Sequence, residues 1–156
     1  MQRTLFSGAH VNGLDAKNRL SVPAPVREVI ENRSAARAVV LVPDEHRPCL
    51  KGFDLSYLDS LQADLDRRFE GDWTPAKADT ARATFAMAET LKIDDNGRVI
   101  LSPILRELGE LAEAECAAFL GGGAYFELWN PAVYLEQPGQ DPRLHRMVRA
   151  LLAARG

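Results

Sequence analysis

A pattern that begins with Asp and ends with Arg occurs twice in this chain, once in each half. The first copy spans Asp15–Arg27 and the second spans Asp94–Arg106. Three charged positions match at one constant offset, which is close to half of the 156 residues: Asp15 with Asp94, Arg19 with Arg98, and Arg27 with Arg106. Repetition at a fixed interval indicates that one structural unit is used twice. We therefore predict two repeats of similar fold, at residues 1–77 and 78–156.

Each copy opens with a polar turn, which is followed by a short aliphatic strand and a proline. The residue before the Arg of the turn is Asn18 in the first copy and Gly97 in the second. Both residue types enter the left-handed backbone region at low cost. The carboxylates of Asp15 and Asp94 are suited to accept hydrogen bonds from backbone N–H groups of such turns. Proline ends a strand and favours the first turn of a helix. Each repeat is therefore predicted to contain a β-hairpin and then a short helix.

Further strands and helices follow in a similar order in both halves. Apolar runs predict strands at Ala38–Val42, Cys49–Phe53, Ala117–Leu120 and Tyr125–Trp129, and near the end of Phe85–Ile93. Helical spacing and proline positions predict helices at Val26–Asn32, Leu55–Phe69, Ala76–Ala83 and after Pro142. The predicted fold class is α+β, with two hairpin-rich repeats that share one small barrel-like core and carry helices outside. Each half alone would bury too little apolar surface, so we expect the halves to complete one another.

The overall charge argues against a nucleic-acid-binding protein, since the formal net charge is −3 at pH 7. The charge is uneven along the chain. Lys and Arg dominate Met1–Arg37, whereas Asp and Glu dominate Asp54–Asp72. An acidic average with a local basic patch permits a DNA-binding face when several copies of the patch line up. No apolar run is long enough to span a bilayer, so we expect a cytoplasmic protein without a membrane partner.

The sequence shows no catalytic residues and no metal or cofactor site. Asp15 and Asp94 could form a carboxylate pair, but neither lies in the Asp-Thr/Ser-Gly loop of such enzymes. The glycines of Gly121–Gly123 lack the Lys-Ser/Thr that follows in a phosphate-binding loop. The remaining candidates are scattered without ligand or nucleophile–base spacing: His10, His46, His145, Cys49 and Cys116. Both cysteines are expected to be reduced thiols. We therefore expect neither an enzyme nor a small-molecule substrate.

The two turns and their flanks together resemble the MraZ family of bacterial proteins. The resemblance rests on Asp-x-Lys-x-Arg-Leu-Ser-Val-Pro from Asp15, Asp-x-x-Gly-Arg with three aliphatic residues from Asp94, and Phe126-Glu-Leu-Trp129. It covers essentially the whole length of the chain. It implies two AbrB/SpoVT-like repeats of the swapped-hairpin type. It also implies a transcriptional regulator, expected to be a repressor, that binds direct repeats upstream of the division and cell-wall gene cluster. Such proteins form homo-oligomeric rings and associate with the nucleoid.

The resemblance also implies which residues contact double-stranded DNA, because the family binds DNA through these turns. The expected DNA-binding residues are Lys17, Arg19 and Arg98, and the expected turn-organising residues are Asp15, Asn18, Asp94 and Gly97. Asn18 departs from the Gly that is usual in the family, and Asn96 stands where the first copy has Lys17. The two turns are therefore expected to differ in affinity. Arg27 and Arg106 are expected to be structural and to pair with nearby carboxylates.

An AbrB-like antitoxin or an interaction scaffold is the alternative function, since AbrB-like units also occur in toxin–antitoxin pairs. The duplication within one chain and the absence of a disordered tail for toxin capture argue against this alternative.

Overall fold

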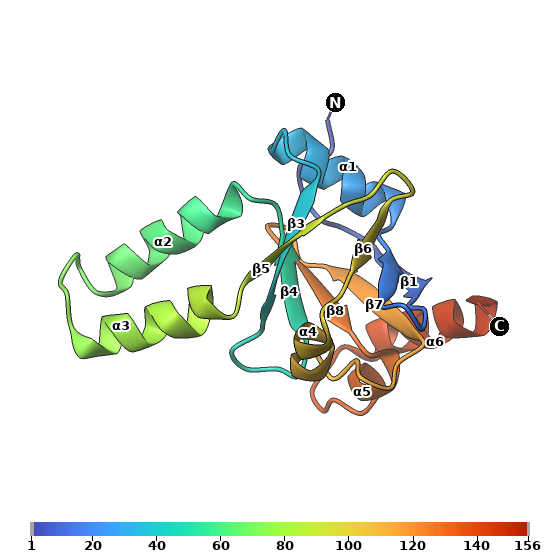
Figure 1. Ribbon diagram of the computed structural model, residues 1–156. Helices are drawn as coiled ribbons and strands as arrows, with labels where there is room; N and C mark the ends of the chain where they lie inside the picture. The colour runs from blue at the N-terminus through green and yellow to red at the C-terminus, as the bar shows by residue number, and fades with distance from the viewer. Residues whose placement is uncertain (1, 156) are drawn as a thin grey trace.

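The computed structural model describes residues 2–155 and has the α+β fold class predicted from the sequence. Strand, strand, helix, strand and strand occur in this order in both halves (Figure 1). The first half contains β1 (Ala9–Gly13), β2 (Arg19–Ser21), α1 (Ala24–Arg33), β3 (Ala38–Pro43), β4 (Leu50–Phe53), α2 (Tyr57–Arg68) and α3 (Pro75–Ala81). The remaining elements are the π-helical turn η1 (Arg82–Ala86), β5 (Glu89–Lys92), β6 (Arg98–Ile100), α4 (Pro103–Leu108), β7 (Cys116–Gly121), β8 (Phe126–Trp129), α5 (Pro131–Leu135) and α6 (Pro142–Arg155).

The strands pair across the two halves of the chain. A six-stranded antiparallel sheet has the order β1-β7-β8-β4-β3-β5, and β2 pairs with β6 in a separate two-stranded ribbon. Thus β1 pairs with β7 of the second half, and β5 pairs with β3 of the first half. Within residues 2–155 the two edge strands, β1 and β5, do not pair with each other, so the sheet is open and is not a closed barrel.

The prediction that each turn joins the two strands of a hairpin is wrong. In the first repeat β1 and β2 share only one isolated bridge, between Leu14 and Leu20, before they enter different sheets. The reason is the apolar face of the short strand. Leu20 of β2 and Val99 of β6 stand opposite each other, and each is no more than 2% exposed. Pairing the two short strands buries both residues in a core that both halves share.

The β2–β6 ribbon has one buried face and one exposed face, because side chains alternate along a strand. Leu20 and Val99 point into the core, whereas the flanking positions point outward. Ile100, on the outer face, is 63% exposed. The buried face belongs to the main core cluster, which also takes residues from α1, α4 and the large sheet. The ribbon is therefore fixed on the body of the molecule with its outer face free.

Helices α1, α5 and α6 lie around the sheet, whereas α2 and α3 extend away from it (Figure 1). In Figure 1, α1 lies near one end of the sheet, and α5 and α6 lie near the other. Helix α6 packs its apolar side, centred on the buried Val148, against β1 and the cluster around Trp129. Helices α2 and α3 form an arm that extends away from the sheet (Figure 1), and we call it the α2–α3 arm. Across residues 2–155, every helix is too short or too polar to cross a bilayer.

The strand predicted in Phe85–Ile93 forms only at its end, as β5. Phe85 and Ala86 lie instead in the turn η1, which continues α3. Thr74 fixes the start of α3, since its hydroxyl accepts a hydrogen bond from the N–H of Lys77 at 3.1 Å. The alanines that follow favour helix over strand. Both cysteines are free thiols; Cys49 is buried and Cys116 is partly exposed.

Candidate nucleic-acid interface

The first turn is closed by the carboxylate of Asp15. Its Oδ1 accepts hydrogen bonds from the backbone N–H groups of Lys17 and Arg19, each at 2.9 Å. Its Oδ2 accepts a hydrogen bond from Nε of Arg19 at 2.7 Å. Asn18 has a φ of 65°, in the left-handed region. The carboxylate therefore fixes both the backbone of the turn and the direction of the Arg19 side chain.

The second turn has nearly the same geometry. Oδ1 of Asp94 accepts hydrogen bonds from the N–H groups of Asn96 at 2.8 Å and Arg98 at 2.9 Å. Gly97 occupies the left-handed position with a φ of 76°. The side-chain contact is looser, because Nε of Arg98 lies 3.6 Å from Oδ2 of Asp94. The two repeats thus build the same turn and hold their arginines with different tightness.

Backbone hydrogen bonds lower the pKa of both turn carboxyls. For Asp15 the largest cause is the N–H of Arg19, and for Asp94 it is the N–H of Arg98. Both carboxyls are therefore ionised at neutral pH. An ionised carboxylate repels DNA phosphates. Each carboxylate is therefore suited to orient the neighbouring arginine and not to contact DNA itself.

The β2–β6 ribbon brings the two turn arginines to one surface. In its register Arg19 stands opposite Ile100, and Arg98 stands opposite Ser21. Arg19 and Arg98 are therefore diagonal neighbours on the outer face, a relation that separates Cα atoms by about 7–8 Å. Their side chains are 36% and 30% exposed, respectively. One arginine from each repeat thus reaches the same exposed patch.

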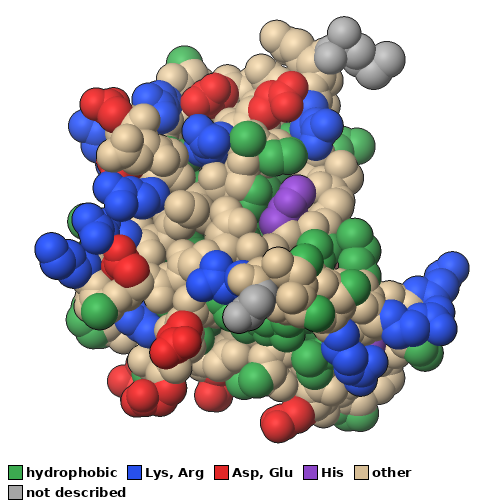
Figure 2. Space-filling model, turned by 90° about the vertical axis from the view of Figure 1, so that its right-hand side faces the viewer, with side chains coloured by type: hydrophobic (Ala, Val, Ile, Leu, Met, Phe, Trp, Pro, Cys, Tyr) green, Lys and Arg blue, Asp and Glu red, His purple; other side chains and the backbone are tan. Residues whose placement is uncertain are grey.

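Lys17 lies at the tip of the first turn. It is exposed, and its ammonium makes no ion pair or hydrogen bond with any residue in the range 2–155. The second turn has Asn96 at this position, which carries no charge. The positive charge at the tips therefore differs between the repeats. Figure 2 shows several Lys and Arg side chains along the left edge of that view, with acidic side chains both above and below them.

Arg27 and Arg106 stabilise the turns, and each acts on the turn of the other repeat. Nη1 of Arg106 donates a hydrogen bond to Oδ1 of Asn18 at 2.8 Å. The guanidinium of Arg27 lies over Gly97, where an added Cβ would be 2.9 Å from its Cζ. Their structural role agrees with the sequence prediction, but the predicted carboxylate partners are wrong. Backbone carbonyls accept their remaining hydrogen bonds, among them those of Val22, Leu111, Ala112 and Ala114.

Gly97 is expected to tolerate no side chain, for two separate reasons. Its positive φ costs an L-residue about 1–2 kcal/mol, and a Cβ would also collide with Arg27. Gly139 is the matched control, with a φ of 74° and no heavy atom within 4 Å of an added Cβ. In urea denaturation, we expect Gly97→Ala to lower the free energy of unfolding more than Gly139→Ala does, by up to about 1 kcal/mol, because the new methyl group must displace the guanidinium of Arg27. Arg27→Ala should remove that excess; equal losses in the two glycine variants would contradict the contact.

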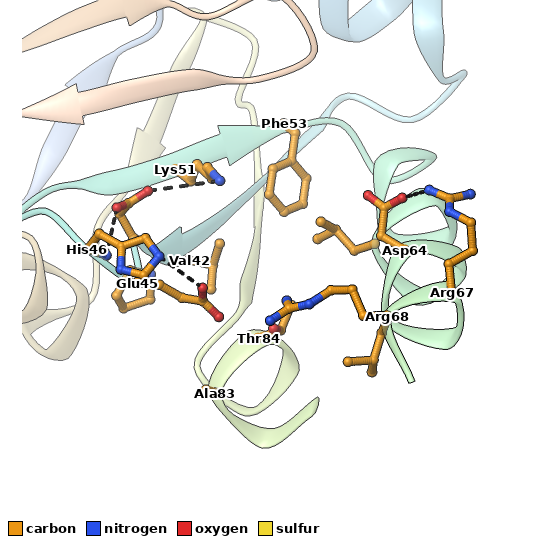
Figure 3. A pocket seen from close by; sticks show the side chains of 14 residues that line it. Val42, Glu45, His46, Lys51, Phe53, Asp64, Arg67, Arg68, Ala83 and Thr84 are labelled. Atoms are coloured by element: carbon orange, nitrogen blue, oxygen red, sulfur yellow. Dashed lines mark hydrogen bonds and ion pairs between the residues drawn. The ribbon is translucent and has the colours of Figure 1, made fainter. Parts of the chain in front are cut away.

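A hollow of about 390 Å³ lies between the β3–β4 connection and the α2–α3 arm (Figure 3). Most of its polar side chains lie beside one another: Lys51 pairs with Asp44 at 3.9 Å, Arg67 pairs with Asp64, and His46 lies 3.5 Å from Glu45. Within the described part of the chain, the residues that line it form no nucleophile–base pair. The arrangement therefore does not suggest a catalytic site.

One group of side chains beside this hollow has potential metal ligands. The ligand atoms of Asp44, Cys49 and Glu127 lie within 4.8 Å of one another. Burial raises the pKa of the Cys49 thiol far above its usual range, with Glu127 adding to the effect, so the thiol is protonated. Lys51 Nζ, 3.9 Å from Asp44, supplies positive charge at the same place. The positive charge of Lys51 therefore already offsets part of the negative charge of this group.

Comparison with known proteins finds relatives that match over most of the chain. No family model matches the chain. The chain is 34% identical over 131 residues to a transcriptional regulator MraZ of Gluconacetobacter diazotrophicus, covering 83% of this chain and 80% of that protein. It is 33% identical over 139 residues to the MraZ regulator of Rhodospirillum rubrum, covering 88% and 87%. The MraZ regulator of Citrobacter koseri is 30% identical over 152 residues, covering 97% and 96%.

These relatives are named as transcriptional regulators and not as enzymes, which agrees with the non-enzymatic function predicted from the sequence. Identity of this level, over most of both chains, confirms the resemblance that the two turns and Phe126–Trp129 indicated. The chain belongs to the MraZ family of transcriptional regulators.

Proposed function

We propose that the chain binds double-stranded DNA in a sequence-specific manner through the outer face of the β2–β6 ribbon. Lys17, Arg19 and Arg98 would make the contacts, and Asp15, Asn18, Asp94 and Gly97 would hold the turns. The observation that supports this most directly is the position of the two arginines. One comes from each repeat, both are partly exposed, and the register makes them diagonal neighbours on one surface.

The hydrogen bonds of the turns leave the outer edge of each guanidinium free for DNA. Asp15 engages Nε of Arg19, so Nη1 and Nη2 remain available. Two parallel N–H donors fit the O6 and N7 acceptors of guanine, or two oxygens of a phosphate. Lys17 would contact a phosphate as a point charge. Because Arg98 is held less tightly and Asn96 replaces the lysine, the first turn should contribute more affinity than the second.

We further propose that several copies assemble into a ring that binds direct repeats. One ribbon offers few contacts, and the net charge of −3 opposes DNA. Linked copies raise the effective concentration of each further contact and so overcome that opposition. The α2–α3 arm supports an assembly, because it extends from the body (Figure 1) and Trp73 near its tip is 80% exposed. The two repeats would be residues 1–77 and 78–156, joined within α3.

The regulatory role that follows is repression of the division and cell-wall gene cluster by a nucleoid-associated protein. The test is a fluorescence anisotropy titration of the full chain with the DNA upstream of its own gene, against a shuffled duplex of equal length and composition. We expect affinity for the upstream DNA to be at least about 10²-fold higher at a salt concentration near physiological, and the preference to need more than one repeat in the duplex. Equal affinity for both duplexes at every salt concentration would contradict sequence-specific binding.

A further inference from the structure

A third arginine lies beside the two turn arginines and comes from the last turn of α6. Arg155 lines a hollow of about 290 Å³ together with Arg19, Arg98 and Ser21. Its guanidinium lies against the backbone of Gly13, where an added Cβ would be 3.2 Å from Nη2. The sequence gives no sign of this proximity, because Arg155 is far from both turns along the chain.

The position of Arg155 is set by the packing of α6. Val148 of this helix is fully buried, and Leu144, Leu151 and Leu152 pack on the same apolar cluster. The helix contacts β1, the strand that leads directly into the first turn. Within residues 2–155, the guanidinium of Arg155 donates one hydrogen bond, from Nη2 to the backbone carbonyl of Glu115, and it is long at 3.4 Å. A single weak bond leaves most of the donors of this guanidinium free.

The hollow has a donor that lacks an acceptor. Nε of Arg98 is shielded from solvent and forms no hydrogen bond with any residue in the range 2–155. The nearest carboxylate contact, to Asp94, is 3.6 Å and too long for a hydrogen bond. A shielded donor without a partner is costly, so the guanidinium of Arg98 is incompletely satisfied within residues 2–155.

Nearby carboxylates balance the charge of the hollow but leave many of its hydrogen-bond donors free. Asp15 has both oxygens engaged by the first turn and by Arg19. Glu115 offers the backbone carbonyl that Arg155 contacts. Together with Asp94, 3.6 Å from Nε of Arg98, these carboxylates match the three guanidinium groups in charge. Most N–H groups of Arg155 and the Nη groups of Arg98 nevertheless donate no hydrogen bond within residues 2–155. An oxyanion with several acceptor oxygens matches such a set of donors better than a neutral ligand does.

We propose that this hollow is a phosphate-binding subsite for the DNA backbone, in which Arg155 and Arg98 contact one phosphate group beside the bases or phosphates bound by Arg19. The proposal rests on the proposed function and adds α6 to the interface. The helix then fixes the distance between the β2–β6 ribbon and one strand of the duplex. Arg155 sets position and affinity without reading sequence, as phosphate contacts do.

The test compares Arg155→Ala with Arg149→Ala, which removes an equal charge from an exposed position on the same helix and does not line the hollow. We expect Arg155→Ala to weaken binding to the upstream and shuffled duplexes alike, by about three- to tenfold. The slope of log affinity against log salt concentration should fall by about 0.9, as expected for one lost phosphate contact. Arg149→Ala should change neither quantity. Arg155→Lys should keep the salt slope while losing part of the affinity.

A structural role would give a different pattern, in which Arg155→Ala lowers the thermal midpoint of unfolding and leaves the salt slope unchanged. A titration of the wild-type chain with inorganic phosphate needs no variant. The Nε–Hε resonances of Arg98 and Arg155 should shift together in NMR spectra, and Arg149 should not shift. If Arg155→Ala binds DNA like wild type while Arg19→Ala is weakened, the subsite is wrong and the proposed function stands. If neither variant weakens binding, the proposed function itself is wrong.

Discussion

The double variant Arg19→Ala/Arg98→Ala is expected to lose specific binding to the DNA upstream of the gene. One well-placed bidentate arginine contributes about 1–3 kcal/mol of discrimination, so removing both should weaken affinity by about 10²-fold or more. Assembly multiplies the loss, because every copy loses its contacts at once. The salt slope should fall as well if either arginine contacts a phosphate. Fluorescence anisotropy at several salt concentrations measures both quantities.

A matched control separates local contact from net charge. Arg146→Ala/Arg149→Ala removes two positive charges from exposed positions on α6 that do not line the hollow beside the ribbon. This control should bind upstream DNA nearly as well as wild type. Size-exclusion chromatography should show both double variants in the same assembly as wild type, because the arginines of the ribbon lie on its outer face. If the two double variants lose affinity equally, general electrostatics accounts for binding and the turns do not read DNA.

The single variants Arg19→Ala and Arg98→Ala are expected to differ in DNA affinity, because the two turns hold their arginines differently. Arg19 is fixed by a 2.7 Å hydrogen bond to Asp15 and has Lys17 beside it, whereas Arg98 has only the 3.6 Å contact to Asp94. A side chain already fixed loses less conformational entropy when it binds. Arg19→Ala should therefore weaken binding more than Arg98→Ala.

The local structure of the turns was predictable because it depends on residues that are close in the chain. An Asp four residues before an Arg, with Asn18 or Gly97 between them, contains all the groups that close the turn. The strands and helices were likewise predictable in position, since their apolar spacing is local. The end of the helix predicted at Ala83 was the exception, because the helical backbone continues through Phe85 as η1.

Strand partners were less predictable, because partner choice depends on which apolar faces meet. Leu20 and Val99 have the same pattern in sequence whether each strand pairs with its neighbour or with the other repeat. The exchange between repeats is what places Arg19 near Arg98. It also brings Arg106 to Asn18, and the packing of α6 brings Arg155 to the ribbon. These long-range contacts arise from the tertiary structure and leave no local signal.

Arg106 is expected to be the most important of the four repeat-motif arginines for stability. Its guanidinium donates to the carbonyls of Leu111, Ala112 and Ala114 and to the side chain of Asn18. Hydrogen bonds from a charged donor contribute about 1.5–3 kcal/mol, and carbonyls left without a donor add a cost. Arg106→Ala should lower the free energy of unfolding by about 2–4 kcal/mol in urea denaturation. Arg27→Ala is the matched control from the other repeat. It should cost about 1 kcal/mol because, within residues 2–155, the Arg27 side chain donates one hydrogen bond, to the carbonyl of Val22.

Arg106 and Arg27 each lie against the turn of the other repeat, so we expect each alanine variant to loosen the turn of the other repeat. Because Arg106 contacts Asn18, Arg106→Ala should loosen the first turn and speed amide hydrogen exchange at Arg19. Because Arg27 lies over Gly97, Arg27→Ala should speed exchange at Arg98 instead. Each variant thus disturbs the turn that is distant in sequence and spares the turn of its own repeat. If amide hydrogen exchange instead increases in the turn of the variant's own repeat, the repeats stabilise their turns independently. The shared β2–β6 ribbon would then not hold the two DNA-contacting arginines in register.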